Sequence, residues 1–350
     1  MKNNGKIIEL IVPCYNEEKC IVLFYNKIKD VFAGMPEYDF IITYIDDGSK
    51  DHTMEEIKKI VSQDGAGRVQ YISLSRNFGK EAALYAGLSN CTGDYVAVLD
   101  ADLQHPPELL KDMVSAIEEE GYDCASARRV TRKGEPFIRS LFSRAFYHVI
   151  NHLTVIDLMP GSTDYRLMKR DVVESIVSMT EKERFTKGIY AWVGFKNKWI
   201  EYENVERAAG KTTWNFWGLV RYAYSGFIAF ATTPLRGVIY MGMLVVLISV
   251  ILAIQIYITA LGTPLTDRTG YSTIIILILF FGGVIITILG MIGEYLARIY
   301  MEVKNRPIYL TRETNIGQDK ADEVKRCLVE IGVREPERKF CHKEDKVVRW

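Results

Sequence analysis

The stretch Gly93–Glu108 reads GDYVAVLDADLQHPPE, and its pattern decides the fold class. A short apolar run, Tyr95–Leu99, ends in two carboxylates, Asp100 and Asp102, and Pro107 then suits the first turn of a helix. An apolar run of this length is typical of a strand buried on both faces of a sheet. We therefore interpret the stretch as a buried strand, a polar loop and the beginning of a helix.

The same pattern recurs upstream. Three further strand-like runs alternate with helix-like segments, the strands at Ile7–Val12, Phe40–Ile45 and Val69–Leu74 and the helices at Glu17–Phe32, Thr53–Gln63, Gly79–Ser89 and Pro107–Glu119. Such alternation predicts an α/β fold with a mainly parallel sheet and helices on both faces. Ligands of such sheets bind at the carboxyl ends of the strands.

A polar cluster follows each of the four apolar runs. The clusters are Pro13–Glu18, Asp46–Ser49, Arg76–Lys80 and Asp100–Gln104. One such cluster would be a turn. Because the carboxyl ends of parallel strands share one edge of the sheet, four clusters predict a single site there.

The aspartates of these clusters suit a nucleotide and a cation. Asp100 and Asp102 are two positions apart in an extended chain, so both can approach one Mg²⁺ or Mn²⁺, which would bridge to a diphosphate. An isolated D-x-D pattern is common in turns, but this one ends a buried strand. Asp46 and Asp47 precede Gly48, which also fits a hairpin turn. Since a helix rather than a return strand follows, we expect carboxylates that accept hydrogen bonds from a nucleoside.

A basic run follows another apolar strand, Asp123–Ala127. It has two interpretations, a solvated loop or an edge that binds phosphate oxygens through arginine forks. Its members are Arg128, Arg129, Arg132, Lys133 and Arg139.

Composition excludes several classes of function. The 350 residues carry a formal net charge of zero, so no global field favours nucleic acid. The six cysteines form no CxxC pair, which argues against a zinc site or a disulfide framework. Gly65-Ala66-Gly67 precedes a strand and lacks a third glycine, so a Rossmann dehydrogenase is disfavoured.

Two uncharged stretches, Gly237–Leu261 and Thr269–Gly293, are each longer than the roughly 20 residues that span a bilayer. With the short link Gly262–Arg268 they predict a transmembrane hairpin, with spans of about 237–261 and 271–293. The alternative, two buried core helices, would need a larger soluble shell than the chain can supply. The hairpin also offers a surface for homo-oligomers.

Basic residues flank this hairpin on one side: Arg221 and Arg236 before it, and Arg298, Lys304, Arg306 and Arg312 after it. The positive-inside rule then places both termini in the cytoplasm, and we expect no signal peptide. Aromatic residues crowd 214–236, which predicts interfacial helices, with a further core helix as the alternative. The expected organisation is a cytoplasmic catalytic domain (1–213), interfacial helices (214–236), a hairpin (237–296) and a charged, solvated tail (297–350) of a multi-pass inner-membrane protein.

The motifs PCYNEE, YIDDGSKDHT, SRNFGKEAALYAGL and GDYVAVLDADLQHPPE resemble family 2 glycosyltransferases with the GT-A fold. More narrowly, the chain resembles polyprenyl-phosphate glycosyltransferases, the group that contains dolichol-phosphate mannose synthase and bacterial undecaprenyl-phosphate glucosyltransferases. The likeness runs from about Ile7 to Arg312.

The resemblance implies roles for particular residues. It implies that Asp100, Asp102 and Gln104 bind a metal ion and the diphosphate. It also implies two catalytic residues, Asp102 and Asp164, of which Asp164 lies beside the reacting sugar. The nucleotide-sugar site it implies comprises Pro13, Tyr15, Glu17, Asp46, Asp47, Lys80 and Arg207. The acceptor phosphate would meet Arg128, Arg139 and Ser143. The family has a lysine near the donor phosphates, and this chain has Thr213 at that position. The resemblance therefore leaves two alternatives: the contact with the phosphates is lost, or Lys211 makes it instead.

The expected reaction is transfer of a hexose from a nucleotide-diphosphate sugar, with UDP-sugars favoured, to polyprenyl phosphate in the membrane, with inversion and with Mg²⁺ or Mn²⁺. The main alternative is a processive polysaccharide synthase, which would need more spans and a Gln-x-x-Arg-Trp motif. A scaffold that only binds nucleotide sugar would not need intact carboxylate motifs. A nucleotidyltransferase would need a second nucleotide-reactive centre, which the sequence lacks.

Overall fold

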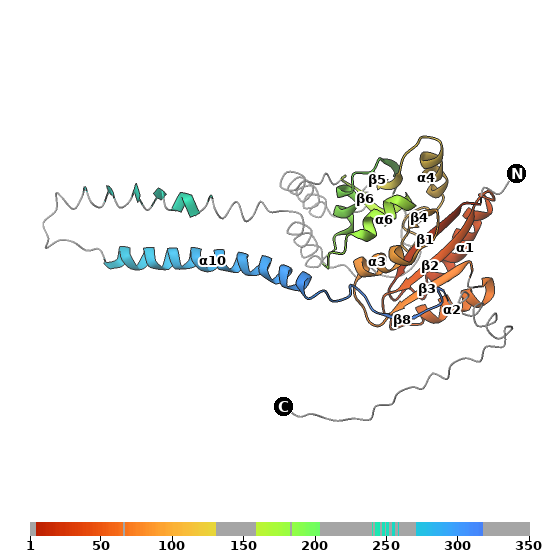
Figure 1. Cartoon of the computed structure of the whole chain (residues 1–350), viewed down its shortest axis with the longest axis horizontal. Coiled ribbons are helices and arrows are strands. Elements are labelled where there is room, and N and C mark those ends of the chain that lie inside the picture. The colour runs from red at the N-terminus through yellow and green to blue at the C-terminus, as the bar shows by residue number, and fades with distance from the viewer. Residues whose placement is uncertain are drawn as a thin grey trace, which may run out of the picture.

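The computed structural model of the chain describes residues 5–65, 67–130, 159–182, 184–203 and 271–317, and isolated residues between 240 and 258. Its centre is an eight-stranded sheet in the order β7-β5-β6-β4-β1-β2-β3-β8 (Figure 1). The strands are β1 (Ile7–Cys14), β2 (Asp39–Asp46), β3 (Val69–Leu74), β4 (Tyr95–Val98), β5 (Cys124–Arg129), β6 (Ser162–Lys169), β7 (Asn197–Tyr202) and β8 (Thr311–Thr314).

The sheet is mixed and mainly parallel. Strand β1 pairs in parallel with β2 and β4, β2 with β3, and β5 with β7. Strands β6 and β8 run antiparallel to their neighbours. The predicted mainly parallel sheet is confirmed, and the five predicted strands agree with β1–β5 to within two residues at each end.

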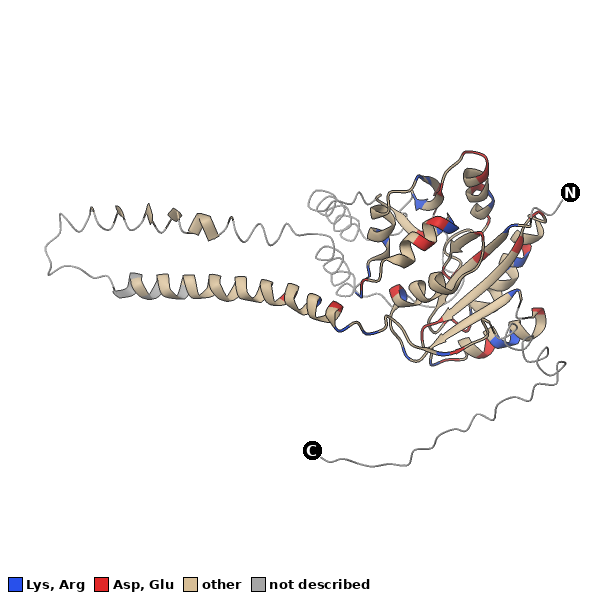
Figure 2. Cartoon of the chain, viewed as in Figure 1, with Lys and Arg blue, Asp and Glu red and all other residues tan. Residues whose placement is uncertain are grey.

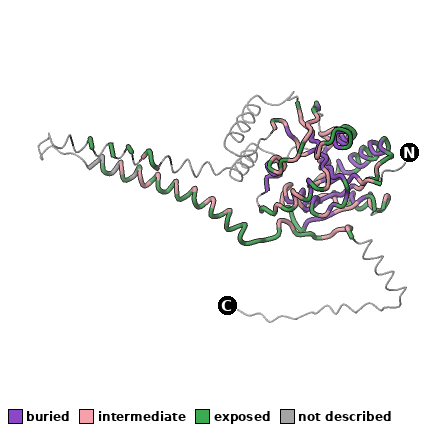
Figure 3. The backbone as a smooth tube through the Cα atoms, turned by 45° about the horizontal axis from the view of Figure 1, so that its top comes forward, coloured by how far each residue is buried: buried purple, intermediate pink, exposed green. Residues whose placement is uncertain are grey.

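Helices cover both faces of the sheet, as the alternating pattern predicted. One face packs against α1 (Ile21–Ala33), α2 (Thr53–Asp64) and α4 (Leu109–Glu118). The other packs against α3 (Lys80–Asn90), α6 (Arg170–Ser178) and α7 (Thr186–Trp192). Figure 3 shows that the buried residues gather in this layered part.

Helix α3 lies close to the sheet because Gly87 has no side chain. A Cβ at this position would lie 2.3 Å from Cγ2 of Ile11 and 2.8 Å from Cδ1 of Ile45, which are side chains of β1 and β2. The close approach fixes the first residue of the helix, Lys80, at the carboxyl end of the strands.

The segment that follows the apolar region differs from the prediction. The sequence pattern predicts a charged, solvated tail over 297–350, but within it Thr311–Thr314 forms β8 and pairs with the edge strand β3. The side chain of Asn315 continues this attachment: its Oδ1 accepts from the Tyr71 N–H at 2.7 Å and its Nδ2 donates to the Val69 carbonyl at 3.1 Å. The chain after the apolar region therefore belongs in part to the sheet.

Helix α10 (Tyr271–Val303) extends away from the layered part and carries charged residues only near its sheet-side end (Figure 2). Among the described residues it is the one helix long and apolar enough to cross a membrane, over Phe280–Val303, and its apolar window is not buried. The described residues between 240 and 258 are helical, and several of their apolar side chains are exposed. Most of the first predicted span and its link lie outside the described residues, so the hairpin stays a prediction.

Candidate functional site

The predicted convergence of polar clusters is visible at the carboxyl edge of the sheet. Lys80, from the cluster after β3, lies between two carboxylates. Its Nζ is 2.7 Å from Oδ1 and 2.9 Å from Oδ2 of Asp100, which follows β4. The same Nζ is 2.7 Å from Oδ2 of Asp164 on β6. Three elements therefore meet through one ammonium group.

The charges of this triad stabilise one another. Burial alone would lower the pKa of Lys80, but the charges of Asp100 and Asp164 and the hydrogen bonds to them outweigh it and raise the pKa. Burial likewise opposes ionisation of Asp164, but the charge of Lys80, helped by Lys187 and Arg166, holds its pKa well below the ordinary value. Asp164 is therefore an ionised carboxylate at neutral pH, and a poor base.

Asp102 lies two residues beyond Asp100 and is only 6% exposed. Its Oδ1 accepts from the backbone N–H of Gln104 at 3.1 Å. Leu103 between them has a φ of 56°, a left-handed conformation that costs a bulky residue about 1 kcal/mol or more. Such strain is typical of functional loops, and here it turns the chain sharply behind Asp102.

Asp46 and Asp47 have internal partners. Asp46 accepts from the Ser49 N–H at 3.0 Å and from the Ser73 hydroxyl at 2.9 Å. Asp47 accepts from the N–H groups of Phe78 and Gly79, at 2.7 and 2.9 Å. Both carboxylates hold neighbouring loops in place, and their contact with a nucleoside stays a prediction.

The loop after β1 is joined to the loop after β2. The backbone N–H groups of Asn16 and Glu17 donate to the hydroxyls of Ser49 and Thr53, at 2.9 and 2.8 Å, and the Lys50 N–H donates to Asn16 Oδ1 at 2.9 Å. Of the predicted nucleoside contacts, Pro13 lies within β1, and Tyr15, which is 36% exposed, and Glu17 lie in this joined pair of loops.

Arg128 is the last residue but one of β5. In the strand order, β5 lies on one side of β6, which carries Asp164, and β3, which Lys80 follows, lies on the other side. The Nε of Arg128 donates to the Pro160 carbonyl at 3.2 Å, and its guanidinium pairs with Glu201 at 3.2 Å. The remaining predicted residues, Arg139, Ser143 and Arg207, lie outside the described residues, as do Lys211 and Thr213.

His105, which follows the D-x-D pattern, also lies at the site. Its Nδ1 lies 2.6 Å from the Tyr202 hydroxyl and its Nε2 lies 3.9 Å from Asp100. Burial lowers the pKa of His105, and this effect outweighs the charges of Asp100 and Asp102, which would raise it. The ring is therefore neutral at neutral pH. The signal in the sequence that could have identified His105 as a site residue is its position close behind Asp100 and Asp102.

The donors at this edge suit a hard cation. Asp100 and Asp102 offer carboxylate oxygens, which Mg²⁺ and Mn²⁺ prefer, and the lysine ammonium already shows that Asp100 attracts positive charge. In the described part of the chain, no group of three or more His, Cys, Asp or Glu side chains is arranged to hold a metal. A cation here would take its other ligands from Gln104, a diphosphate or water.

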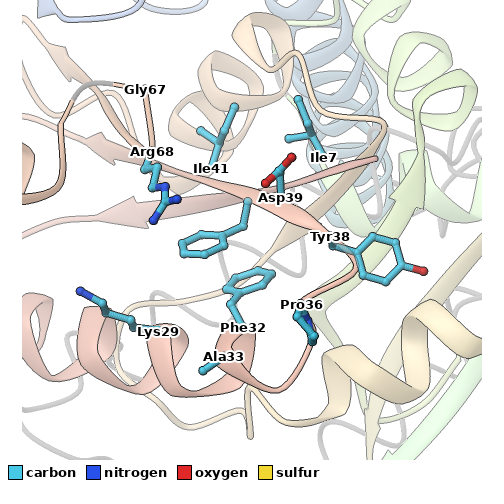
Figure 4. Close-up of a pocket in the computed structure, with 11 residues that line it drawn as sticks. Ile7, Lys29, Phe32, Ala33, Pro36, Tyr38, Asp39, Ile41, Gly67 and Arg68 are labelled. Carbon is cyan, nitrogen blue, oxygen red and sulfur yellow. The ribbon is translucent and has the colours of Figure 1, made fainter. Parts of the chain in front are cut away.

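A separate hollow lies at the opposite end of the sheet. Ile7 and Asp39, which begin β1 and β2, line it together with Phe32 and Arg68 (Figure 4). The ring of Phe32 stacks on that of Phe40 at 4.2 Å. Because it lies at the amino ends of the strands, this hollow is not part of the polar site.

Comparison with known proteins agrees with this geometry. Residues 9–177 match the model of glycosyl transferase family 2. A putative glycosyltransferase of Bacillus subtilis, CsbB, is 44% identical over 89% of this chain and 92% of its own length. A prophage-derived bactoprenol glucosyl transferase of Shigella flexneri is 38% identical over 89% of this chain and 99% of its own. The chain therefore belongs to glycosyl transferase family 2.

Solved structures are more distant. A mannosyltransferase of Pyrobaculum calidifontis, in complex with GDP-Man and Mn²⁺, matches at 18% identity with a TM-score of 0.45, over 66% of this chain and 67% of that chain. A likeness this weak says nothing about what the present chain binds.

Proposed function

We propose that this protein transfers a hexose from a nucleotide-diphosphate sugar, with UDP-glucose the first candidate, to polyprenyl phosphate in the membrane. One observation carries the proposal: a carboxylate-rich site at the carboxyl edge of the sheet is joined, through β8, to a helix long and apolar enough to cross a membrane. The names of relatives that match nearly end to end, bactoprenol glucosyl transferases among them, support the same acceptor.

Asp100, Asp102 and Gln104 would hold the cation, which would supply positive charge against the departing nucleoside diphosphate. The acceptor phosphate is already an anion at neutral pH and needs no base. The protein therefore acts by placing the acceptor in line with the sugar and by holding charged groups around the reacting centre. Direct attack by the acceptor inverts the anomeric centre, and the ionised Asp164 stabilises the positive charge that develops there.

The segment that follows helix α10, residues 304–314, supports a membrane-bound acceptor. Seven residues, 304–310, separate the end of α10 from β8, and a fully extended segment of this length spans about 25 Å. Leu310 accepts from the Ser75 N–H at 2.8 Å, directly ahead of the loop that carries Lys80. This attachment supports a site within reach of the headgroup layer, as a lipid acceptor requires. We place both termini in the cytoplasm of a multi-pass inner-membrane protein.

A first prediction tests this attachment. Asn315→Ala leaves the Tyr71 N–H and the Val69 carbonyl without their partner, so we expect the free energy of unfolding to fall by about 1–3 kcal/mol. The thermal unfolding midpoint of the purified protein in detergent measures the loss. Thr311→Ala changes an exposed residue of β8, the strand that directly precedes Asn315; it is the matched control and should unfold as the wild type does. If both variants behave alike, the side chain of Asn315 does not secure the attachment.

A second prediction concerns the acceptor phosphate. Arg128→Gln removes a charged fork from the end of β5, and we expect the KM for polyprenyl phosphate to rise about tenfold or more, with little change in donor affinity. Lys198→Gln removes a positive charge from the neighbouring strand β7, where Lys198 pairs with Glu120, and should leave both values unchanged. An equal loss of donor affinity in Arg128→Gln would place this arginine in the donor site instead.

The proposed function is tested by a donor screen. Purified protein is given undecaprenyl phosphate and one radiolabelled nucleotide sugar at a time, and radioactivity in the chloroform phase is counted. We expect one UDP-hexose to label the lipid well above the others. The proposal fails if no nucleotide sugar labels the lipid while the protein is folded and binds nucleotide.

A further inference from the structure

The ammonium group of Lys80 contacts both oxygens of Asp100, one of the predicted metal ligands, at 2.7 and 2.9 Å. A divalent cation bound by a carboxylate lies about 2.0–2.6 Å from its oxygens, so cation and ammonium would be like charges on the same group. The two cannot hold Asp100 from one side together.

The backbone before Lys80 is held by hydrogen bonds, whereas the long side chain of Lys80 is partly exposed. Asp47 holds the two N–H groups just before Lys80, and Gly79 has a φ of 99°, which only glycine adopts readily. The lysine stem has four rotatable carbons, and 38% of the side chain is exposed. Asp164, 2.7 Å from the ammonium, offers a second anion that keeps the lysine in the site once it leaves Asp100.

Without a cation between them the two carboxylates would repel each other. Asp100 and Asp164 are 24% and 19% exposed, so water screens their charges only in part. The lysine ammonium removes this repulsion with a charge that the chain itself supplies. If a cation took over Asp100, the same ammonium would be free to pair with an incoming phosphate oxygen.

We propose that Lys80 is a positioning residue that serves as a placeholder cation: it holds Asp100 and Asp164 together in the donor-free enzyme and releases Asp100 to the divalent cation. The idea rests on the proposed function, because it takes the D-x-D pair as the cation site. It adds that an internal lysine competes with that cation. The donor-free protein should therefore bind the metal weakly, and its affinity should be limited by Lys80.

The test measures Mn²⁺ binding to the full-length, donor-free protein by the electron paramagnetic resonance signal of the free ion. We expect Lys80→Met to bind Mn²⁺ on the order of tenfold more tightly than the wild type. Lys80→Arg keeps the charge and should stay close to the wild type. Lys59→Met, which removes a lysine paired with Glu56 on the surface of α2, should change nothing. The gain should vanish in Lys80→Met combined with Asp100→Ala.

A second readout does not depend on transfer activity. Without metal, Lys80→Met should unfold at a lower temperature than the wild type because Asp100 and Asp164 then repel each other, and Mn²⁺ should restore its midpoint while moving that of the wild type little. Lys80→Gln repeats the comparison if the methionine variant folds poorly. Unchanged Mn²⁺ affinity in Lys80→Met and Lys80→Gln, or no Mn²⁺ binding in any of the proteins, overturns the proposal. Since neither readout uses an acceptor, failure to label polyprenyl phosphate would count against the proposed function alone.

Discussion

Replacing Asp102 with alanine is expected to slow sugar transfer by about a thousandfold, which corresponds to about 4 kcal/mol of lost transition-state stabilisation. Asp102 is nearly buried at the turn behind β4, and its partner Asp100 is the other carboxylate that faces the predicted cation. Loss of either should leave the charge on the departing diphosphate unneutralised. The rate is measured with saturating nucleotide sugar and polyprenyl phosphate, and Asp100→Ala should show a similar loss.

The matched control is Asp112→Ala, which removes an exposed carboxylate from the first turn of α4 and should leave the rate unchanged. Chelation should stop transfer by the wild type, and added Mg²⁺ or Mn²⁺ should restore it. Full activity in excess EDTA would rule out the cation assignment for Asp100 and Asp102.

Asp164→Asn is expected to lower kcat by about a hundredfold or more while donor affinity changes little. The amide keeps the shape of the side chain but loses the charge that Lys80 pairs with and that would face the anomeric centre. Donor affinity is measured by calorimetry and kcat by product formation. Asp123→Asn removes a carboxylate that pairs with Lys169 at the other end of β6, and it serves as the control.

The pH profile separates electrostatic stabilisation from general-base catalysis by Asp164. Although burial favours the protonated form, the charge of Lys80 holds the pKa well below the ordinary value, so Asp164 remains ionised as the pH falls from neutral towards 5. We therefore expect no acid limb from this group in the wild type. An acid limb that disappears in Asp164→Asn would make Asp164 a general base.

Five of the eight strands, β1–β5, could be predicted because they are largely buried on both faces. Strands β1–β4 appear as short, mainly apolar runs, and burial between two helical layers favours such runs. Strand β8, with the sequence Thr311-Arg312-Glu313-Thr314, carries no apolar signal at all. It forms because the edge of β3 offers unpaired backbone groups, and that partner is more than 200 residues away in the sequence.

The candidate site, like the sheet, could be predicted from the sequence only in part. The rule that parallel strands end at a common edge correctly brought Lys80 and Asp100 together. It could not show that the lysine also reaches Asp164, because β6 lies beyond the predicted strands and the reach of a long side chain depends on tertiary packing. The hydrogen-bond partners of Asp46 and Asp47 within the protein could not be predicted either, because a buried carboxylate accepts from whichever donors the fold places beside it.

The acceptor is the central claim, and one measurement tests it most directly. Purified protein in liposomes receives its labelled donor and divalent cation, with or without undecaprenyl phosphate, and the products are separated between chloroform and water. We predict that label enters the chloroform phase only when the lipid phosphate is present, as one sugar per lipid that mild acid releases. A water-soluble polymer formed without any lipid phosphate would contradict the account and would favour a processive polysaccharide synthase.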